Sequence, residues 1–422
     1  MTKARTGTSC LHKILLTAAI SWLGLNSVFA QTWIQTMAPS NNWICIASSA
    51  DGSKLAAGTW PGLIYTSTNS GITWTPTAAP NEYWSSIASS ADGTKLVAAA
   101  AGFSGGGSGV VCTSTNSGFT WNSNCVPNEY WGSVASSADG CKLVVVAPLD
   151  ANIMGPGAIF TSTNSGNDWT SNDVPGFSYP SAVASSADGT KLFLAGGFEV
   201  WRSTNSGAAW TLDSTAPFIW GITSPSQFIA SSADGNKLVL ALSDSDEHGN
   251  PGQIYTSTNS GDTWQLSGAP SNQWQSVASS ADGNTLLAVP GFDGWFGLIY
   301  VSTNSGVSWT TNNSPYFGWG AVASSADGGK LWAAGESDTN NNGAWIYTLQ
   351  SIHPPSMYIA PTNGILALSW LAPSTNFVLQ QSGDLNSWTE IADAPTLNLT
   401  SLQDEVFLPP TNGGGFYRLA TP

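Results

Sequence analysis

Short apolar stretches alternate with Gly-, Ser- and Asn-rich stretches along the whole chain, and this pattern recurs at regular intervals. In one unit, residues 84–90 alternate between apolar and polar and lead into an Asp-Gly dipeptide, which is typical of a hairpin turn. Residues 95–100 are apolar enough to be buried on both faces, and two shorter stretches follow, 110–113 and one beginning at Thr120. Each unit is therefore predicted to contain four antiparallel β-strands.

Two sequence markers define the period of this pattern. The hexapeptide Ala-Ser-Ser-Ala-Asp-Gly occurs seven times at intervals of 41 to 49 residues, and six copies are followed by Ser-Thr-Asn-Ser-Gly-x-x-Trp. A period of about 45 residues with several short strands per unit is typical of a β-propeller blade. We therefore predict an all-β fold with a seven-bladed β-propeller over residues 31–350. The hexapeptide begins at Ala47, Ala88, Ala135, Ala184, Ala230, Ala278 and Ala323.

The two ends of the repeat region complement each other. The seventh unit stops after residues 345–348, without the second marker and without a fourth strand. Residues 31–36 align with residues 72–77, which open the fourth strand of the first unit. The first segment after residue 30 is therefore predicted to supply the outer strand of the seventh blade. Such an exchange closes the ring and leaves no long unpaired sheet edge.

The N-terminus has the pattern of a secretory signal peptide. Lys3, Arg5 and Lys13 precede the apolar stretch 14–25, and small residues before Ala30 resemble a cleavage site. Residues 1–30 are therefore expected to be removed, and the mature protein is expected to be secreted or periplasmic. No later segment has 18 uninterrupted apolar residues, so no membrane insertion is expected.

The mature chain is strongly acidic. Removal of residues 1–30 leaves 8 Lys and Arg against 26 Asp and Glu, a net charge of −18. A chain of this charge repels nucleic acids and anionic membrane surfaces, because binding to both depends on attraction to phosphate. The charge therefore argues against a nucleic-acid partner.

The second marker resembles the Asp-box of BNR-repeat propellers, a group that includes sialidases, sortilin, xyloglucan hydrolases and photosystem II assembly factors of the Ycf48 type. Every copy has Asn where that family has Asp. The resemblance implies a structural role, in which the Asn oxygen accepts backbone N–H groups, Gly adopts positive φ and Trp packs under the hairpin. These positions are Asn69, Gly71, Trp74; Asn116, Gly118, Trp121; Asn164, Gly166, Trp169; Asn205, Gly207, Trp210; Asn259, Gly261, Trp264; Asn304, Gly306, Trp309.

Candidate catalytic residues are few. Sialidases bind the substrate carboxylate with three arginines, whereas the mature chain has only Arg202 and Arg418, so a sialidase is disfavoured. A glycosidase needs two carboxylates roughly 5–10 Å apart. Acids between the second and third strands could supply them: the candidates are Asp244, Asp246, Glu247, Glu336 and Asp338. No cofactor or metal is predicted, although residues 244–248 could hold calcium without having a defined calcium-loop pattern.

Aromatic residues recur where each blade begins. Two interpretations are open: a ring of aromatics that stacks on sugar rings at the channel mouth, or wedges that fill the space between blades. Recurrence in nearly every blade favours the second. Two tryptophans in variable loops, Trp60 and Trp295, are better candidates for ligand contacts. The recurring residues are Trp43, Trp84, Trp131, Trp220, Trp274 and Trp319, with Tyr179 near the same place in the fourth blade.

Four cysteines remain in the mature chain, and they do not recur in every repeat. Cys112 and Cys125 flank one predicted hairpin, so a disulfide between them is predicted in an oxidising compartment. With only His248 and His353 as mature histidines, a structural zinc site is not expected.

The repeat ends before a Pro-containing linker, residues 351–355. Residues 356–422 are predicted to form a small β-sandwich-like module, with strands around 366–370 and 377–382 and a closing Phe-Tyr-Arg. This pattern resembles the fibronectin-like modules that end many secreted bacterial proteins, which implies an accessory role.

Together these features predict a monomeric, non-enzymatic binding or scaffold protein. Its expected partner is a carbohydrate or an extracellular protein bound on the propeller face. Two alternatives stay open: a polysaccharide hydrolase that uses paired loop carboxylates, and an assembly factor of the Ycf48 kind.

Overall fold

The computed structural model describes residues 32–101, 109–123, 126, 129–148, 157–172, 174, 177, 179–197, 199–217, 225–244, 252–291, 296–311, 313–336, 343–350, 357–362, 365–371, 378–392, 395–398, 402–408 and 416–420. All regular elements among them are strands, so the fold is all-β. Within these ranges there is no helix long and apolar enough to span a membrane. The predicted signal peptide lies outside the described residues.

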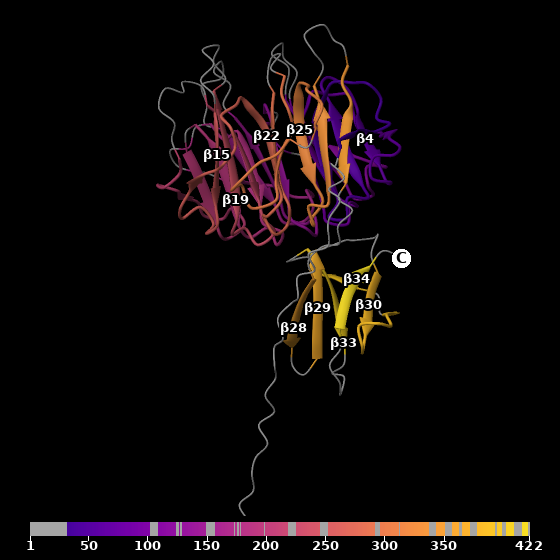
Figure 1. Cartoon of the computed structure of the whole chain (residues 1–422). Coiled ribbons are helices and arrows are strands. Elements are labelled where there is room, and N and C mark those ends of the chain that lie inside the picture. Colours follow the sequence, from indigo (N-terminus) through magenta and orange to yellow (C-terminus); the bar gives the residue numbers. More distant parts are fainter. Residues whose placement is uncertain are drawn as a thin grey trace, which may run out of the picture. The chain divides into compact units, whose positions relative to one another are not determined.

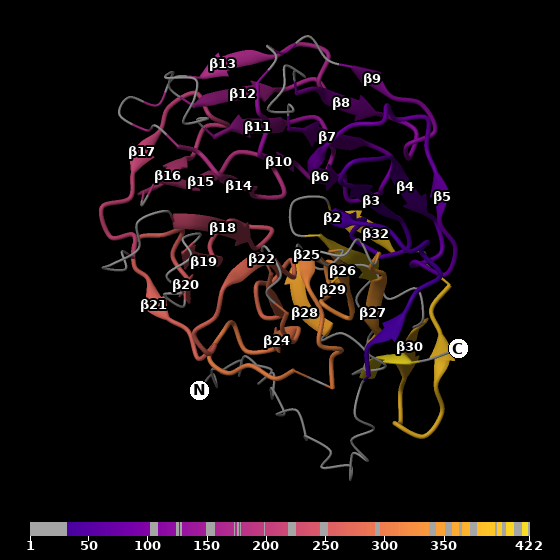
Figure 2. The same cartoon turned by 90° about the horizontal axis from the view of Figure 1, so that it is seen from above.

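The described residues between 32 and 350 form a β-propeller of antiparallel sheets around a common centre (Figure 2). The first three sheets follow the chain from the centre outward. They are β2 (Trp43–Ser48), β3 (Leu55–Thr59), β4 (Ile64–Ser67) and β5 (Thr75–Pro76); β6 (Trp84–Ser89), β7 (Leu96–Ala100), β8 (Val111–Ser114) and β9 (Asn122–Ser123); and β10 (Ser133–Ser136), β11 (Leu143–Ala147), β12 (Ala158–Ser162) and β13 (Thr170–Asn172).

The next sheets repeat this order. They are β14 (Ala182–Ser185), β15 (Leu192–Gly196), β16 (Glu199–Ser203) and β17 (Thr211–Leu212); β18 (Pro225–Ser231), β19 (Leu238–Asp244), β20 (Gln253–Ser257) and β21 (Gln265–Leu266); and β22 (Trp274–Ser279), β23 (Leu286–Pro290) and β24 (Tyr300–Ser302). In the last of these, a single bridge between Val301 and Thr310 stands where the other sheets have a fourth strand.

The final sheet joins the two ends of the repeat region. It has the order β1-β27-β26-β25, with β1 (Ile34–Gln35), β27 (Ile346–Gln350), β26 (Lys330–Gly335) and β25 (Trp319–Ser324). Ile34 lies opposite Thr348 and Gln35 opposite Tyr347 in an antiparallel pair. The predicted closure by the first segment after residue 30 is therefore confirmed. Backbone hydrogen bonds across this sheet tie the start of the propeller to its end.

A second closure runs around the centre. The N–H of Ala50 donates to the carbonyl of Ala91 at 2.7 Å, and the same bond links the second alanine of each hexapeptide to that of the next blade. The last bond, from Ala326 back to Ala50 at 2.8 Å, completes the ring. These alanines are all buried, and their small side chains allow the inner strands to converge. The ring consists of Ala50, Ala91, Ala138, Ala187, Ala233, Ala281 and Ala326.

The core lies between neighbouring sheets. The second strand of each sheet is covered on both faces by its neighbours, so it is apolar throughout and does not alternate. All five residues of β7 and all five of β11 are buried, for example. This agrees with the continuous apolar stretches in the sequence.

The C-terminal residues form two further small sheets, coloured yellow in Figure 1. Leu368, Trp370, Leu379 and Val406 form their core. The assignment of this part to a fibronectin-like module stays a prediction, and linker residues 351–355 lie outside the described ranges. The sheets are β28 (Met357–Thr362), β29 (Ile365–Leu371), β33 (Gln403–Leu408) and β32 (Thr396–Asn398); and β31 (Thr389–Glu390), β30 (Val378–Ser382) and β34 (Phe416–Ala420).

Candidate functional site

The propeller has two chemically different ends. At the strand-entry end, the first strand of each blade begins and the second strand connects to the third. At the turn end lie the Asp-Gly turns of the hexapeptide and the Ser-Thr-Asn-Ser-Gly turns of the second marker. The antiparallel order of the strands places these two kinds of turn together, away from the strand-entry end.

Lysines join the blades at the turn end. The Nζ of Lys54 donates to the backbone carbonyl of Asp92 in the next blade at 2.9 Å, and its stem lies over Gly93. Burial alone would raise the pKa of Asp92, but hydrogen bonds from Ser90 and Thr94 and the charge of Lys54 hold it below its ordinary value. The aspartates of four other blade turns have lowered pKa values for the same reasons: Asp51, Asp139, Asp188 and Asp234.

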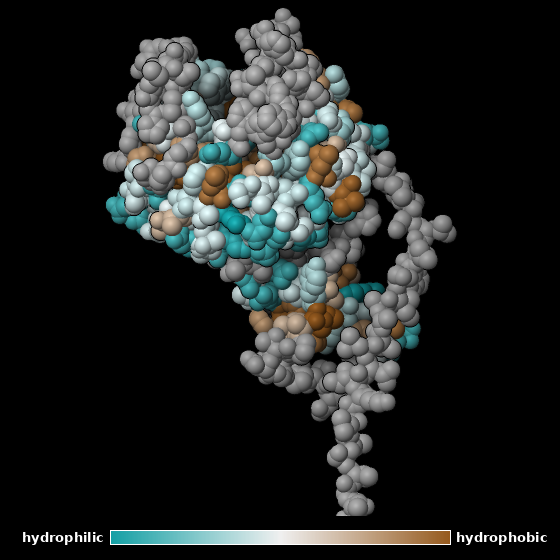
Figure 3. Space-filling model, turned by 90° about the vertical axis from the view of Figure 1, so that its left-hand side faces the viewer, coloured by the Kyte–Doolittle hydropathy of each residue, from teal (hydrophilic) through white to brown (hydrophobic). Residues whose placement is uncertain are grey.

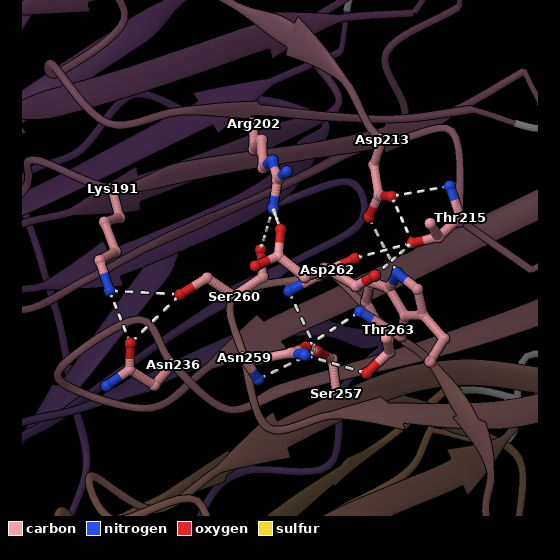
Figure 4. Close-up of polar contacts among 12 residues, drawn as sticks. Lys191, Arg202, Asp213, Thr215, Asn236, Ser257, Asn259, Ser260, Asp262 and Thr263 are labelled. Atoms are coloured by element: carbon pink, nitrogen blue, oxygen red, sulfur yellow. Dashed lines mark hydrogen bonds and ion pairs between the residues drawn. The ribbon is translucent and has the colours of Figure 1, made fainter.

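The second marker also has a structural role, which Figure 4 shows for one blade. Asn259 Oδ1 accepts the backbone N–H of Thr263 at 2.9 Å and the hydroxyl of Ser257 at 2.9 Å. Gly261 has φ of +92°. The other five copies have the same Ser–Asn contact and a positive-φ glycine, so these residues maintain the turn in the way that the sequence predicts.

Figure 4 also shows contacts between neighbouring blades. Lys191 reaches Asn236 at 2.7 Å and Ser260 at 3.2 Å. Arg202 forms an ion pair with Asp262 at 2.5 Å. Lys191 and Arg202 thus both bond to residues of the next blade, so these turn-end contacts stabilise the junction between blades.

The aromatic ring predicted as a binding surface is part of the core. Five of its tryptophans have at most 1% of their surface exposed, so they cannot stack on a ligand. Each lies between blades: the indole N–H of Trp84 donates to Gly62 O of the preceding blade at 3.0 Å, for example. The interpretation as wedges is therefore correct for Trp43, Trp84, Trp131, Trp274 and Trp319. Trp220 lies outside the described residues.

One of the two loop tryptophans can be placed. Trp60 is half-buried at the strand-entry end and packs edge-on against Tyr83, with ring centroids 5.2 Å apart. Trp295 lies outside the described residues. Tyr179, which stands near the aromatic position in the fourth blade, is half exposed. Trp60 and Tyr179 therefore remain accessible, whereas the repeated tryptophans do not.

An aromatic pair that the sequence analysis missed lies at the same end. Phe296 and Tyr316 stack with ring centroids 6.3 Å apart and an interplanar angle of 25°, and they are 40% and 68% exposed. Behind them, the backbones of Gly297 and Phe317 exchange hydrogen bonds of 2.8 and 3.1 Å. Phe317 packs in turn on Trp345, with centroids 6.2 Å apart. We call Phe296 and Tyr316 the aromatic pair.

The channel widens into a cavity of about 230 Å³ toward the strand-entry end. Its lining is uncharged and includes Ser85, Ser86, Ser133 and Gln275. Several hydroxyls already bridge blades: Ser85 Oγ donates to Trp131 O at 2.6 Å, and Ser86 Oγ accepts the N–H of Val134 at 3.1 Å. Among the described residues, this lining includes Cys45 but no Asp, Glu, His, Lys or Arg.

The predicted carboxylate pair is not assembled by the described residues. Of its five candidates, only Glu336 has a described side chain; it follows β26 and is half-buried. Asp244 ends β19, and Asp246, Glu247 and Asp338 lie outside the described ranges. Two half-buried glutamates that were not among the predicted candidates, Glu82 and Glu129, also lie at this end. Across the described part of the chain, no three His, Cys, Asp or Glu side chains gather in a way that could hold a metal ion.

The predicted disulfide needs a correction. Cys112 is a buried free thiol whose Sγ lies 3.7 Å from Ser123 Oγ, and burial raises its pKa. It packs in the core between two blades, with Ile64 and Trp84. Its predicted partner, Cys125, lies outside the described residues.

No protein-family model and no curated protein sequence matches this chain. Solved structures share its fold at low sequence identity. A GH74 xyloglucanase from Xanthomonas campestris has a TM-score of 0.54 at 16% identity, covering 80% of this chain and 59% of that one. A hydrazine synthase from Kuenenia stuttgartiensis has a TM-score of 0.54 at 15% identity, over 75% of this chain and 97% of that one.

YCF48 from Cyanidioschyzon merolae has a TM-score of 0.51 at 16% identity, over 76% of this chain and 98% of that one. The chain thus spans about three fifths of the xyloglucanase and nearly all of the other two. At these identities the similarity shows the β-propeller fold and carries no activity.

Proposed function

We propose that this chain is a secreted, non-enzymatic binding protein whose strand-entry end binds a carbohydrate chain. The observation that carries this proposal is the aromatic pair, in which Tyr316 is 68% exposed and its ring lies near-parallel to that of Phe296, with centroids 6.3 Å apart. Aromatic faces with a polar edge pack on the C–H face of a sugar ring, while the phenol can hydrogen-bond its hydroxyls.

Backbone hydrogen bonds hold together the two segments that carry the aromatic pair. Its two residues come from different segments, the β23–β24 connection and the segment that enters β25. The Gly297–Phe317 backbone bridge holds these segments together, so the rings are positioned before a ligand arrives. Positioning in advance reduces the conformational entropy lost on binding.

A carbohydrate chain needs less exposed apolar surface than a protein partner does. A stable protein interface needs about 800 Å² on each partner with an apolar centre. On the side of the molecule that Figure 3 shows, apolar residues form separate brown patches within a mostly pale and teal surface. A sugar chain needs only one or two aromatic rings and hydrogen-bonding groups around them.

The test uses the mature chain, residues 31–422, and a panel of soluble polysaccharides in affinity electrophoresis and titration calorimetry. Tyr316→Ala should weaken binding of the retained polysaccharide by about tenfold, the order expected when one stacking ring is lost. Phe119→Ala is the matched control, because Phe119 is an 81% exposed aromatic in a turn-end loop. Equal loss in both variants, or no binding to any polysaccharide, would refute the proposal.

The hydrolase alternative is tested in the same samples. Release of reducing ends that Glu336→Gln abolishes would establish catalysis, and binding without release supports the non-enzymatic proposal. An extracellular protein partner would instead be recovered in stoichiometric amounts by the wild-type chain and lost with Tyr316→Ala.

A further inference from the structure

Three serine hydroxyls in the central cavity of about 230 Å³ have protons to donate. Ser86, Ser133 and Ser276 line this cavity and occupy the same repeat position, two residues before the hexapeptide. Each hydroxyl oxygen accepts one backbone N–H from the next blade, at 3.1 to 3.2 Å. Among the described residues, none of the three has an acceptor for its own proton. Because a hydroxyl can accept and donate at once, all three can donate to a molecule in the cavity.

A fourth polar group lines the same cavity. Gln275 is half-buried, and its side chain hydrogen-bonds to no other described residue. Its amide therefore has two N–H donors and a carbonyl acceptor available.

These four polar residues come from opposite sides of the channel. Gln275 and Ser276 lie on β22, whereas Ser86 lies on β6 and Ser133 on β10. Around the ring, the sheets of β14 and β18 separate β22 from β10, and the sheets of β25 and β2 separate it from β6 (Figure 2). A molecule in the cavity can therefore be held from both sides.

The serine hydroxyls at the turn end of the channel are not available in this way. Ser279, at the other end of β22, lines a separate cavity and donates to the backbone carbonyl of Ser280 at 2.9 Å. The equivalent serine of every other hexapeptide makes the same bond to the residue that follows it. The protons of these serines are thus used within the protein.

The lining of the strand-entry cavity does not suit a charged or a purely apolar ligand. Among its described residues there is no cation for an anion to pair with and no carboxylate to bind a metal ion. Burial raises the pKa of the Cys45 thiol to about 12, so this lining residue is neutral as well. An apolar molecule would displace water and leave the hydroxyls and the amide without partners.

A small polyol or a single sugar unit matches this lining. Its hydroxyl oxygens can accept from the serines, and its O–H groups can donate to the Gln275 carbonyl. At about 30 Å³ per water molecule, the cavity volume corresponds to roughly eight waters, which suits one ring and not a chain. The C–H groups of such a ring can pack on branched aliphatic side chains. Those that line the cavity are Ile46, Ile87, Ile229, Val277 and Val322.

We infer that this cavity is a second binding site, which takes a small neutral polyol or a monosaccharide between Ser86 and Ser133 on one side and Gln275 and Ser276 on the other. The inference goes beyond the proposed function and uses neither residue of the aromatic pair. The aromatic pair offers an exposed face to a polysaccharide, whereas this site surrounds a single unit with hydrogen-bonding groups.

The experiment measures binding of small probes to residues 31–422 by saturation-transfer-difference NMR titration. The neutral probes are D-glucose, D-galactose, myo-inositol and erythritol, and D-glucuronate and D-galacturonate are the charged counterparts of the first two. We expect saturable binding of at least one neutral probe and weaker binding of the charged counterparts. Absence of saturable binding for every neutral probe would mean that the cavity holds only water, and would overturn the inference. Uronates that bind as tightly as the neutral sugars would overturn it as well.

Gln275→Leu is the decisive variant, because it removes the amide without breaking a side-chain hydrogen bond to any described residue. It should weaken binding of the retained probe by about three- to tenfold, the range for one hydrogen bond. Ser276→Ala should weaken it as well, although this change also deprives the N–H of Val322 of its acceptor. Ser279→Ala, on the same strand but in the turn-end cavity, is the matched control and should leave the affinity unchanged. Equal affinity of Gln275→Leu and the wild-type chain would overturn the inference.

Tyr316→Ala separates this site from the proposed function. Probe binding should be unchanged in this variant. Loss of probe binding with Tyr316→Ala, but not with Gln275→Leu, would assign the probe to the aromatic pair and overturn the inference while supporting the proposed function. Failure of every polysaccharide to bind, with probe binding retained, would overturn only the proposed function.

Discussion

Thr285→Lys should stabilise the propeller at the one blade junction that has no lysine contact. In six of the repeat units, a lysine two residues after the hexapeptide reaches the turn of the next blade. The remaining unit, whose hexapeptide begins at Ala278, has Thr285 at that position. The side chain of Thr285 lies over Gly328 of the next turn, as the stem of Lys54 lies over Gly93. A lysine at 285 can therefore follow the same path and donate to the backbone carbonyl of Asp327.

Asp327 is the aspartate in the turn that Thr285 faces, and its pKa is raised. Burial raises this pKa above its ordinary value, in spite of hydrogen bonds from Ser325 and Gly329 and the charge of Lys330. Asp92, with Lys54 across the junction, has a lowered pKa instead. A carboxyl with a raised folded-state pKa stabilises the fold most below its unfolded pKa, and that contribution is lost as pH rises through the folded value. The added lysine should lower the pKa of Asp327 and recover stability at neutral pH.

The expected gain is about 0.5–1 kcal/mol at pH 7, the range for a charge-assisted contact that is partly open to solvent. In a domain of this size that raises the unfolding temperature by roughly 1–2 °C. Thermal unfolding followed by tryptophan fluorescence at pH 7 and pH 4 measures it, with Thr285→Met as the uncharged control of similar length. The gain should be smaller at pH 4. Equal gains for Lys and Met at both pH values would mean that packing, not charge, stabilises the junction.

Three further predictions concern stability and thiol reactivity. Asn69→Ala should lower the free energy of unfolding, measured by chemical denaturation, by about 1 kcal/mol, because the N–H of Thr73 loses its acceptor. Asn69→Asp should retain stability. Equal losses in the two variants would contradict this role. Below pH 4 the propeller should lose stability. Turn aspartates with lowered pKa values, such as Asp92, contribute stability above the unfolded-state pKa, and this contribution is lost as pH falls through the folded-state pKa. A free energy of unfolding that stays constant from pH 5 to pH 2 would count against this prediction. Burial raises the pKa of Cys45 to about 12, so this thiol should resist alkylation at pH 8 until the chain unfolds. Peptide mapping after iodoacetamide treatment measures this, and rapid modification of Cys45 in the native chain would contradict the prediction.

The architecture could be predicted from the sequence because its cause is local and repeated. The Asp-Gly turns, the apolar second strands and the half-repeat at each end all lie within short segments, and hairpins form between neighbours along the chain. The β1–β27 pair was predictable for the same reason, since residues 31–36 match the segment that each other blade supplies from its own sequence. Two predictions needed more than local pattern. The tryptophans at the blade entrances could have faced either solvent or core, and Cys112 could have paired or packed inside.

The tertiary structure decided those questions, because burial in a propeller depends on the neighbouring blade, about 45 residues away. Trp84 is buried because the Gly62 segment of the preceding blade covers it and accepts its indole N–H. Phe296 and Tyr316 become a pair only when the Gly297–Phe317 bridge brings their segments together. The lysine position can be read from the sequence, yet its partner lies in the next blade, so only the folded ring shows the contacts that join neighbouring turns. The sequence by itself determined the blades, and the contacts between blades determined the surface that is left to bind.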